Sequence, residues 1–153
     1  MSRIDLSEDH RETLCELLTT AFATTADLGS QVRQARWLIR RDVAASSLLA
    51  EIHEQLQPIG DRLLHRVMAL GGVPDATLRG IVDSSILPPY DVPLGSASAH
   101  LEALADRFEV LAASLRRNVD MTGQLEDPIT AFVFAGVSEA VEAAMGRLDR
   151  ASA

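Results

Sequence analysis

Apolar residues recur every three or four positions along four long stretches of the chain, and this spacing is typical of amphipathic helices. The stretches cover about residues 7–41, 42–70, 96–121 and 128–150 of 153. Each gathers its apolar side chains on one stripe, which must be buried against other helices. Aromatic residues make up only 4% of the chain, and this favours helices because strands are rich in aromatic and β-branched residues.

The pattern is interrupted between the second and third helices, in residues 73–95, which contain four of the six prolines. We expect a long crossover here, with a short helix over about 77–86. The other links are short, and Gly71-Gly72 and Pro128 mark helix ends. The sequence therefore predicts an all-α fold, a ferritin-like four-helix bundle whose crossover contains a short helix, in a single domain over 1–153.

The charge balance limits the partners of such a bundle. There are 22 acidic side chains and 14 arginines but no lysine, for a net charge of −8. This field repels nucleic acid, so we expect no DNA binding.

No apolar run approaches the roughly 18 residues of a membrane span, and the first ten residues have no apolar signal core. We expect a cytoplasmic protein without a membrane partner, in which Cys15 is a small core residue without a disulfide.

The polar residues of the second helix lie opposite its apolar stripe. When successive residues advance by about 100°, Glu54, Asp61 and His65 project away from the face that holds Ile52 and its apolar neighbours. A di-iron centre inside the bundle needs inward carboxylates, so the pattern argues against one. Trp37 also projects away from the core of the first helix, as expected of an anchor at a subunit interface.

Three segments resemble the Dps family of mini-ferritins. Gln-Ala-Arg-Trp-Leu-Ile-Arg at 34–40 is similar to the family's Lys-Ala-His-Trp-Asn-Val-Arg. Residues 61–74 resemble its Asp-x-x-x-Glu-Arg…Leu-Gly-Gly-x-Pro, and residues 100–108 resemble its His-Leu-x-x-Leu-Ala-Asp-Arg-Tyr. The resemblance implies a hollow cage of twelve subunits, with the crossover helix at a twofold axis. It also implies iron oxidation between subunits, so the implied partners are further copies or a paralogous Dps subunit.

The ferroxidase ligands of the family are mostly replaced in this sequence. The register anchored at Gly71-Gly72 keeps one aspartate, Asp61. The remaining ligand positions are occupied by Arg36, Ser46, Ser47, Ala50 and His65. An arginine does not release its proton to bind a metal. We therefore expect no catalytic residue at the usual site, and an Arg36–Asp61 salt bridge between subunits, beside Trp37, in place of the metal.

Two alternatives stay open beside this degenerate cage subunit. The chain is a ferroxidase with a rebuilt iron site of Asp61, His65 and Glu54, since the string Ile52-His53-Glu54-Gln55-Leu56 resembles a family motif seven residues too late. Otherwise it is a structural or co-assembling cage protein without catalysis. Enzyme activity is thus left undecided.

The resemblance also implies acidic iron-entry pores between the third and fourth helices. Asp120, Glu126 and Asp127 are the candidate pore residues in this region. For Glu126 and Asp127, capping of the following helix is an equally good interpretation, because acidic side chains favour helix N-termini.

Overall fold

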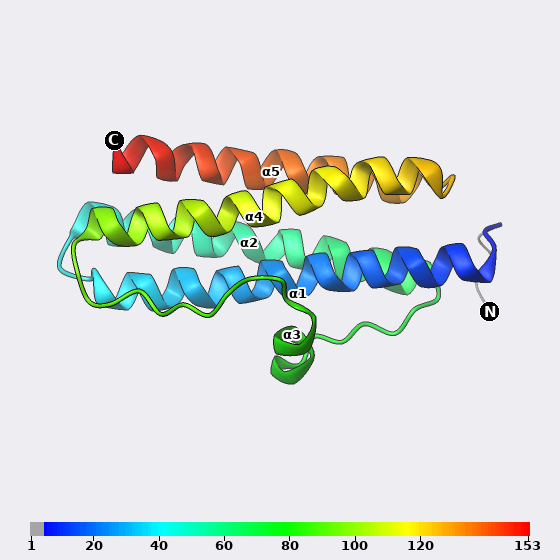
Figure 1. Ribbon diagram of the computed structural model, residues 1–153, viewed down its shortest axis with the longest axis horizontal. Coiled ribbons are helices and arrows are strands. Elements are labelled where there is room, and N and C mark those ends of the chain that lie inside the picture. Colours follow the sequence, from blue (N-terminus) through cyan, green and yellow to red (C-terminus); the bar gives the residue numbers. More distant parts are fainter. Residues whose placement is uncertain (1–4) are drawn as a thin grey trace.

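The computed structural model describes residues 5–153, and this part of the chain forms four long helices and one short one (Figure 1). The helices are α1 (Glu8–Leu38), α2 (Val43–Ala69), α3 (Leu78–Ser84), α4 (Ala97–Gln124) and α5 (Pro128–Ser152). The long helices form two antiparallel hairpins, α1–α2 and α4–α5, that lie side by side. The predicted all-α bundle is confirmed, and the short helix lies in the crossover as expected.

Side-chain caps begin each long helix. The hydroxyl of Ser7 accepts a hydrogen bond from the backbone N–H of His10, as predicted for the start of α1, and Asp42 and Ser96 do the same for α2 and α4. Gly71 ends α2 with a φ of 83°, a left-handed conformation that glycine adopts without strain. The chain then turns into the crossover, which returns along the whole bundle before α4 begins.

Leucine, valine, isoleucine and phenylalanine side chains from all four long helices fill the core. Fully buried examples are Leu14, Leu18, Leu28, Leu49, Ile52, Leu63, Leu104, Phe108, Leu111, Leu115 and Phe134. Burial of each such side chain contributes roughly 1.5–3 kcal/mol relative to exposure. The predicted stripes of α1, α2 and α4 therefore supply the main cohesion of the bundle.

The buried face of α5 agrees with the predicted one at Val133, Val137, Ala144 and Leu148 but differs at two positions. The helical spacing of the sequence places Phe132 and Ala140 on the apolar stripe as well, but Phe132 is 71% exposed and Ala140 is exposed. Phe134 and Val141 are fully buried instead. The physical reason is that α5 packs along α4 and stands off from α2, so its buried face is turned toward α4.

Among residues 5–153, α5 is also the helix whose length and composition would allow it to cross a membrane. Such a helix is weak evidence for a membrane span, because the core helix of a soluble bundle has the same composition. Phe134 and Leu148 of this helix pack in the bundle core, whereas Ile129 and Phe132 are exposed.

Candidate functional site

Asp61 borders a cavity of about 300 Å³ where α1, α2 and α3 meet. Among the described residues that line the cavity, Asp61 is the only one with a carboxylate. Most of the wall is apolar, and Gly60 brings α2 close to α1, because a Cβ there would lie 3.3 Å from a ring carbon of Phe22. One carboxylate in an apolar wall does not supply the ligand set that an iron ion requires.

Glu54, Asp61 and His65 lie on one exposed face of α2, as predicted. Seven residues separate Glu54 from Asp61, which is about 10 Å along the helix axis. In residues 5–153, no three His, Cys, Asp or Glu side chains are close enough to hold a metal together. Any metal bound by this face would need groups from a second subunit, so the predicted ligands stay a prediction.

His53, the neighbour of Glu54, connects α2 to α1. Its Nδ1 lies 3.0 Å from the carbonyl oxygen of Gly29, and since a carbonyl only accepts, Nδ1 carries the proton and donates. The ring is half-buried between the two helices. His53 therefore has a structural partner within the chain, and only its Nε2 retains a lone pair.

Arg36 and Trp37 lie in the last turns of α1, far from Asp61 within one chain. Ala26 lines the Asp61 cavity, and Arg36 follows it by ten residues, or about 15 Å along α1. Both side chains are exposed, Trp37 to 65%. Within residues 5–153 neither Arg36 nor Asp61 forms an ion pair. A contact between them requires two subunits.

Asp127 is the N-cap of α5 and is 4% exposed. Its carboxylate accepts hydrogen bonds from the backbone N–H groups of Ile129 and Thr130 and pairs with Arg66 of α2 at 3.0 Å. Burial alone would raise the pKa of Asp127, but hydrogen bonds from Thr130 and Arg66 outweigh it, so this pKa is lowered. Capping is thus the observed role of Asp127.

The other two candidate pore residues are exposed on either side of this cap. Asp120 lies near the end of α4, and Glu126 lies in the link to α5 with a φ of 59°. Neither has an ion-pair partner in the described part of the chain. Both carboxylates are exposed, and their place at a pore stays a prediction.

Sequence reasoning missed a polar network that fastens the crossover to α1. Asp27 accepts from the Ser85 hydroxyl at 2.6 Å and from the Gln31 amide at 3.1 Å. The Gln31 amide also donates to the carbonyl of Pro88 at 2.9 Å, and Thr24 accepts from the N–H of Ile86. A signal existed: Thr24, Asp27 and Gln31 are polar residues at helical spacing beside the apolar stripe of α1.

A second missed contact fastens the crossover to α4. The hydroxyl of Tyr90 lies 2.6 Å from Nδ1 of the fully buried His100, and the Arg107 guanidinium lies 5.1 Å from the Tyr90 ring centroid. Burial lowers the pKa of His100 and raises that of Tyr90 to about 12. Tyr90 therefore keeps its proton and donates to a neutral imidazole.

Comparison with known proteins agrees with this architecture. A DNA protection during starvation protein of Agrobacterium fabrum is 27% identical over 147 residues, which are 95% of this chain and 91% of the relative. The solved structure of DpsC from Streptomyces coelicolor matches with a TM-score of 0.93 at 19% identity, covering 100% of this chain and 91% of that one. An archaeal Dps homologue from Halobacterium salinarum matches with a TM-score of 0.85 at 20% identity, over 100% of this chain and 90% of that one.

Two paired helical hairpins joined by a crossover with a short helix define the class of ferritin-like bundles. Residues 15–144 match the ferritin-like domain, and the chain therefore belongs to the ferritin-like family. The relative from Agrobacterium fabrum and the two solved structures named above are similar to it along almost the whole chain, and both structures carry Dps in their names.

Proposed function

We propose that this chain is the subunit of a Dps-type cage whose usual inter-subunit ferroxidase site is replaced by a salt bridge. The observation that carries the proposal is the outward placement of Arg36 and Asp61, each exposed and without an ion-pair partner in residues 5–153. The cage holds iron as cargo in the cytoplasm, and further copies or a paralogous Dps subunit are its partners.

The substitution has a physical basis. A guanidinium occupies the space of a bound metal ion and its charge-assisted hydrogen bonds satisfy a carboxylate. Because the Arg36 side chain is permanently positive, it would exclude a second cation from the same place. Trp37, beside Arg36, would cover the pair with a large apolar surface at the subunit interface.

The decisive experiment is ferrous oxidation by the purified protein with hydrogen peroxide. We expect only the slow rate of iron in buffer. A combined variant, Arg36→His with Ala50→Asp and His65→Glu, restores three ligands of the family and should raise the rate at least tenfold. Rapid saturable oxidation by the unaltered protein would contradict the proposal.

A second candidate function is iron oxidation at a rebuilt site on α2. It is favoured by the single exposed face that Glu54, Asp61 and His65 share. This function predicts one or two bound iron or zinc ions per subunit after metal loading, whereas the salt-bridge proposal predicts none at this face. Metal analysis of the protein and of a His65→Ala variant separates the two.

Cage assembly, iron entry and DNA binding can each be tested independently of iron oxidation. Native mass spectrometry should find a closed oligomer of about twelve subunits, or mixed particles when a paralogous Dps subunit is co-expressed. Asp120→Asn with Glu126→Gln should slow iron uptake into an assembled cage if these two side chains line a pore. Gel retardation at low salt should detect no DNA shift, because the chain carries a net charge of −8.

A further inference from the structure

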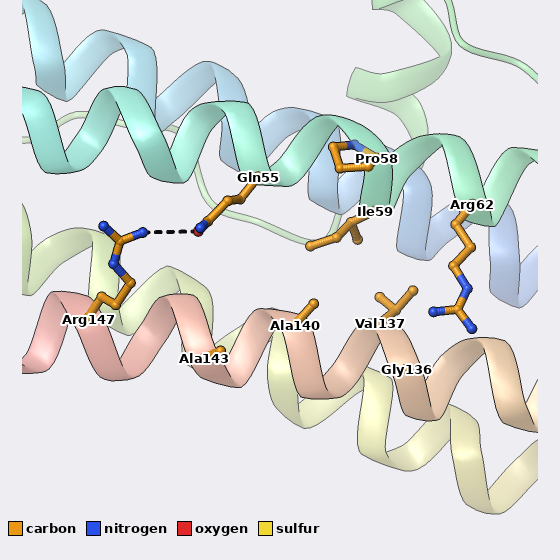
Figure 2. A pocket seen from close by; sticks show the side chains of 9 residues that line it. All are labelled: Gln55, Pro58, Ile59, Arg62, Gly136, Val137, Ala140, Ala143 and Arg147. Atoms are coloured by element: carbon orange, nitrogen blue, oxygen red, sulfur yellow. Dashed lines mark hydrogen bonds between the residues drawn. The ribbon is translucent and has the colours of Figure 1, made fainter.

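An open groove of about 430 Å³ runs between α2 and α5, where these two helices stand apart (Figure 2). Ile59, Val137 and Ala140 point into it, and the walls are mainly apolar. Its size falls within the range of small-molecule sites. None of the candidate iron ligands or pore residues named above lines this groove.

Each end of the groove carries an arginine, and only one of the two is paired with an acidic side chain in residues 5–153. At one end Arg147 forms an ion pair with Glu51 and donates to the side-chain oxygen of Gln55 at 3.4 Å. At the other end Arg62 forms neither an ion pair nor a hydrogen bond with any residue of 5–153. One end is therefore neutralised, and the other presents an unpaired positive charge.

The Arg62 side chain is nevertheless held in place. Its Cζ lies 5.6 Å from the ring centroid of Phe132, within the range of a cation–π contact. Figure 2 shows the guanidinium reaching from α2 toward α5 beside Gly136. A Cβ at Gly136 would lie only 2.4 Å from Nη1 of Arg62, so the missing side chain is what admits the guanidinium. Arginine donors match the planar oxygens of a carboxylate.

We propose that this groove binds a medium-chain aliphatic carboxylate, with its carboxylate on Arg62 and its alkyl chain along α5 toward Arg147. The apolar wall from Gly136 to Ala143 spans seven residues, or about 10 Å. With C–C bonds of about 1.5 Å, an extended chain of roughly eight to ten carbons covers that length. Arg62 is the one free positive charge of the groove, because Glu51 neutralises Arg147 at the other end. A ligand with a single negative charge is therefore favoured. This site is separate from the proposed function of the cage.

Isothermal titration of decanoate, below its micelle-forming concentration, into the full-length assembled protein tests the site. We expect saturable binding with one site per chain. Arg62→Gln should weaken it about tenfold, as for a lost charge-assisted hydrogen bond, while Arg150→Gln, outside the groove on the same bundle, should not. Decanol lacks the carboxylate. It should therefore bind to the unaltered protein about as weakly as decanoate binds to the Arg62→Gln variant.

Two further variants separate a specific site from general adsorption to apolar surface. Ala140→Leu fills the groove from an exposed position and should abolish binding, whereas Ala135→Leu, exposed on α5 outside the groove, should leave it unchanged. Gly136→Ala should raise the melting temperature, as alanine does in a helix, and yet weaken binding by displacing Arg62. The proposal is overturned if decanoate does not saturate, if decanol binds as tightly, or if Ala140→Leu binds normally.

Discussion

Arg66 of α2 and Asp127, the N-cap of α5, form a buried ion pair that ties the two hairpins together at the corner of the bundle. The Arg66 side chain is 11% exposed and that of Asp127 is 4% exposed, and Arg66 also donates to the Thr130 hydroxyl at 2.9 Å. Because Asp127 simultaneously caps α5, one carboxylate fixes both the start of a helix and its position against α2. Such a group is costly to remove, since its loss strands a buried guanidinium.

Asp127→Ala should lower the free energy of unfolding by about 3 kcal/mol, from the lost cap and the stranded charge together. Urea denaturation at neutral pH measures this change. Glu142→Gln is the matched control, because the Arg116–Glu142 pair is 3.7 Å long and half exposed, and its loss should cost under about 0.5 kcal/mol. Equal effects of the two variants would contradict the assigned role of Asp127.

The same carboxylate predicts how acid acts on the fold. Since the folded pKa of Asp127 is lowered, its contribution to stability is fully present above the unfolded value of about 4. The contribution is lost as the pH falls through the lowered folded value. Denaturation curves from pH 5 down to pH 2.5 should fall less steeply for Asp127→Asn than for the unaltered protein, whereas parallel curves would show that other carboxylates dominate.

His100 predicts a separate pH dependence nearer to neutrality. Its folded pKa is lowered by burial, so the unfolded chain binds more protons and stability is lost as the pH falls below about 6.5. His100→Asn removes the titrating group and should flatten the change in unfolding free energy between about pH 6.5 and 5. His65→Asn, on the exposed face of α2, should keep the slope of the unaltered protein. An unchanged slope in His100→Asn would assign the dependence to another group.

The bundle was predictable because helical periodicity is a local property of sequence. Leu49 and Leu63 repeat with the spacing of α2, and that spacing places both in the core whatever the partner helix is. Phe132 and Phe134 show the limit of such reasoning. Which of the two is buried depends on the rotation of α5 against α4, and this rotation is set by packing between helices and not by the α5 sequence alone.

The candidate site was predictable only as far as its outward direction. Exposure of Trp37, Asp61 and His65 followed from helix geometry, whereas the contacts proposed for them between subunits stay a prediction. Within the chain, Gln31 bonds a carbonyl 57 residues away, and no local pattern indicates such a pairing. Polar contacts between segments that are far apart in the sequence therefore could not be predicted from it.

Trp37 provides a test of the interface prediction. Because its side chain is 65% exposed in the single chain, Trp37→Ser should leave the secondary structure of the subunit intact. If the residue anchors a subunit contact, the same change should shift the protein to smaller oligomers in size-exclusion chromatography. Val110→Ser, at another partly exposed position, serves as the control and should keep the oligomer of the unaltered protein. An unaltered elution volume for Trp37→Ser would remove Trp37 from the interface.

The contacts of Gly72 with Cys15 and Val67 explain why a second glycine follows Gly71 at the end of α2. A Cβ at Gly72 would lie 2.7 Å from the Cys15 sulfur, 2.9 Å from Val67 Cγ1 and 3.2 Å from the Val67 carbonyl oxygen. Gly72→Ala should therefore destabilise the protein by about 2 kcal/mol through overpacking, measured by urea denaturation. Gly123 has open space around its Cα, so Gly123→Ala should instead stabilise the protein by about 0.5 kcal/mol.

The Cys15→Ala substitution then tests whether Cys15 or Val67 causes the destabilisation expected for Gly72→Ala. Removing the sulfur relieves the shortest contact but leaves both contacts to Val67, so Cys15→Ala should recover only part of the loss caused by Gly72→Ala. The coupling between the two substitutions should be about 1 kcal/mol, as is usual for side chains in contact. Full recovery would show that the sulfur alone excludes a side chain from position 72. Strict additivity would show that Cys15 moves aside at no cost and that Val67 sets the limit.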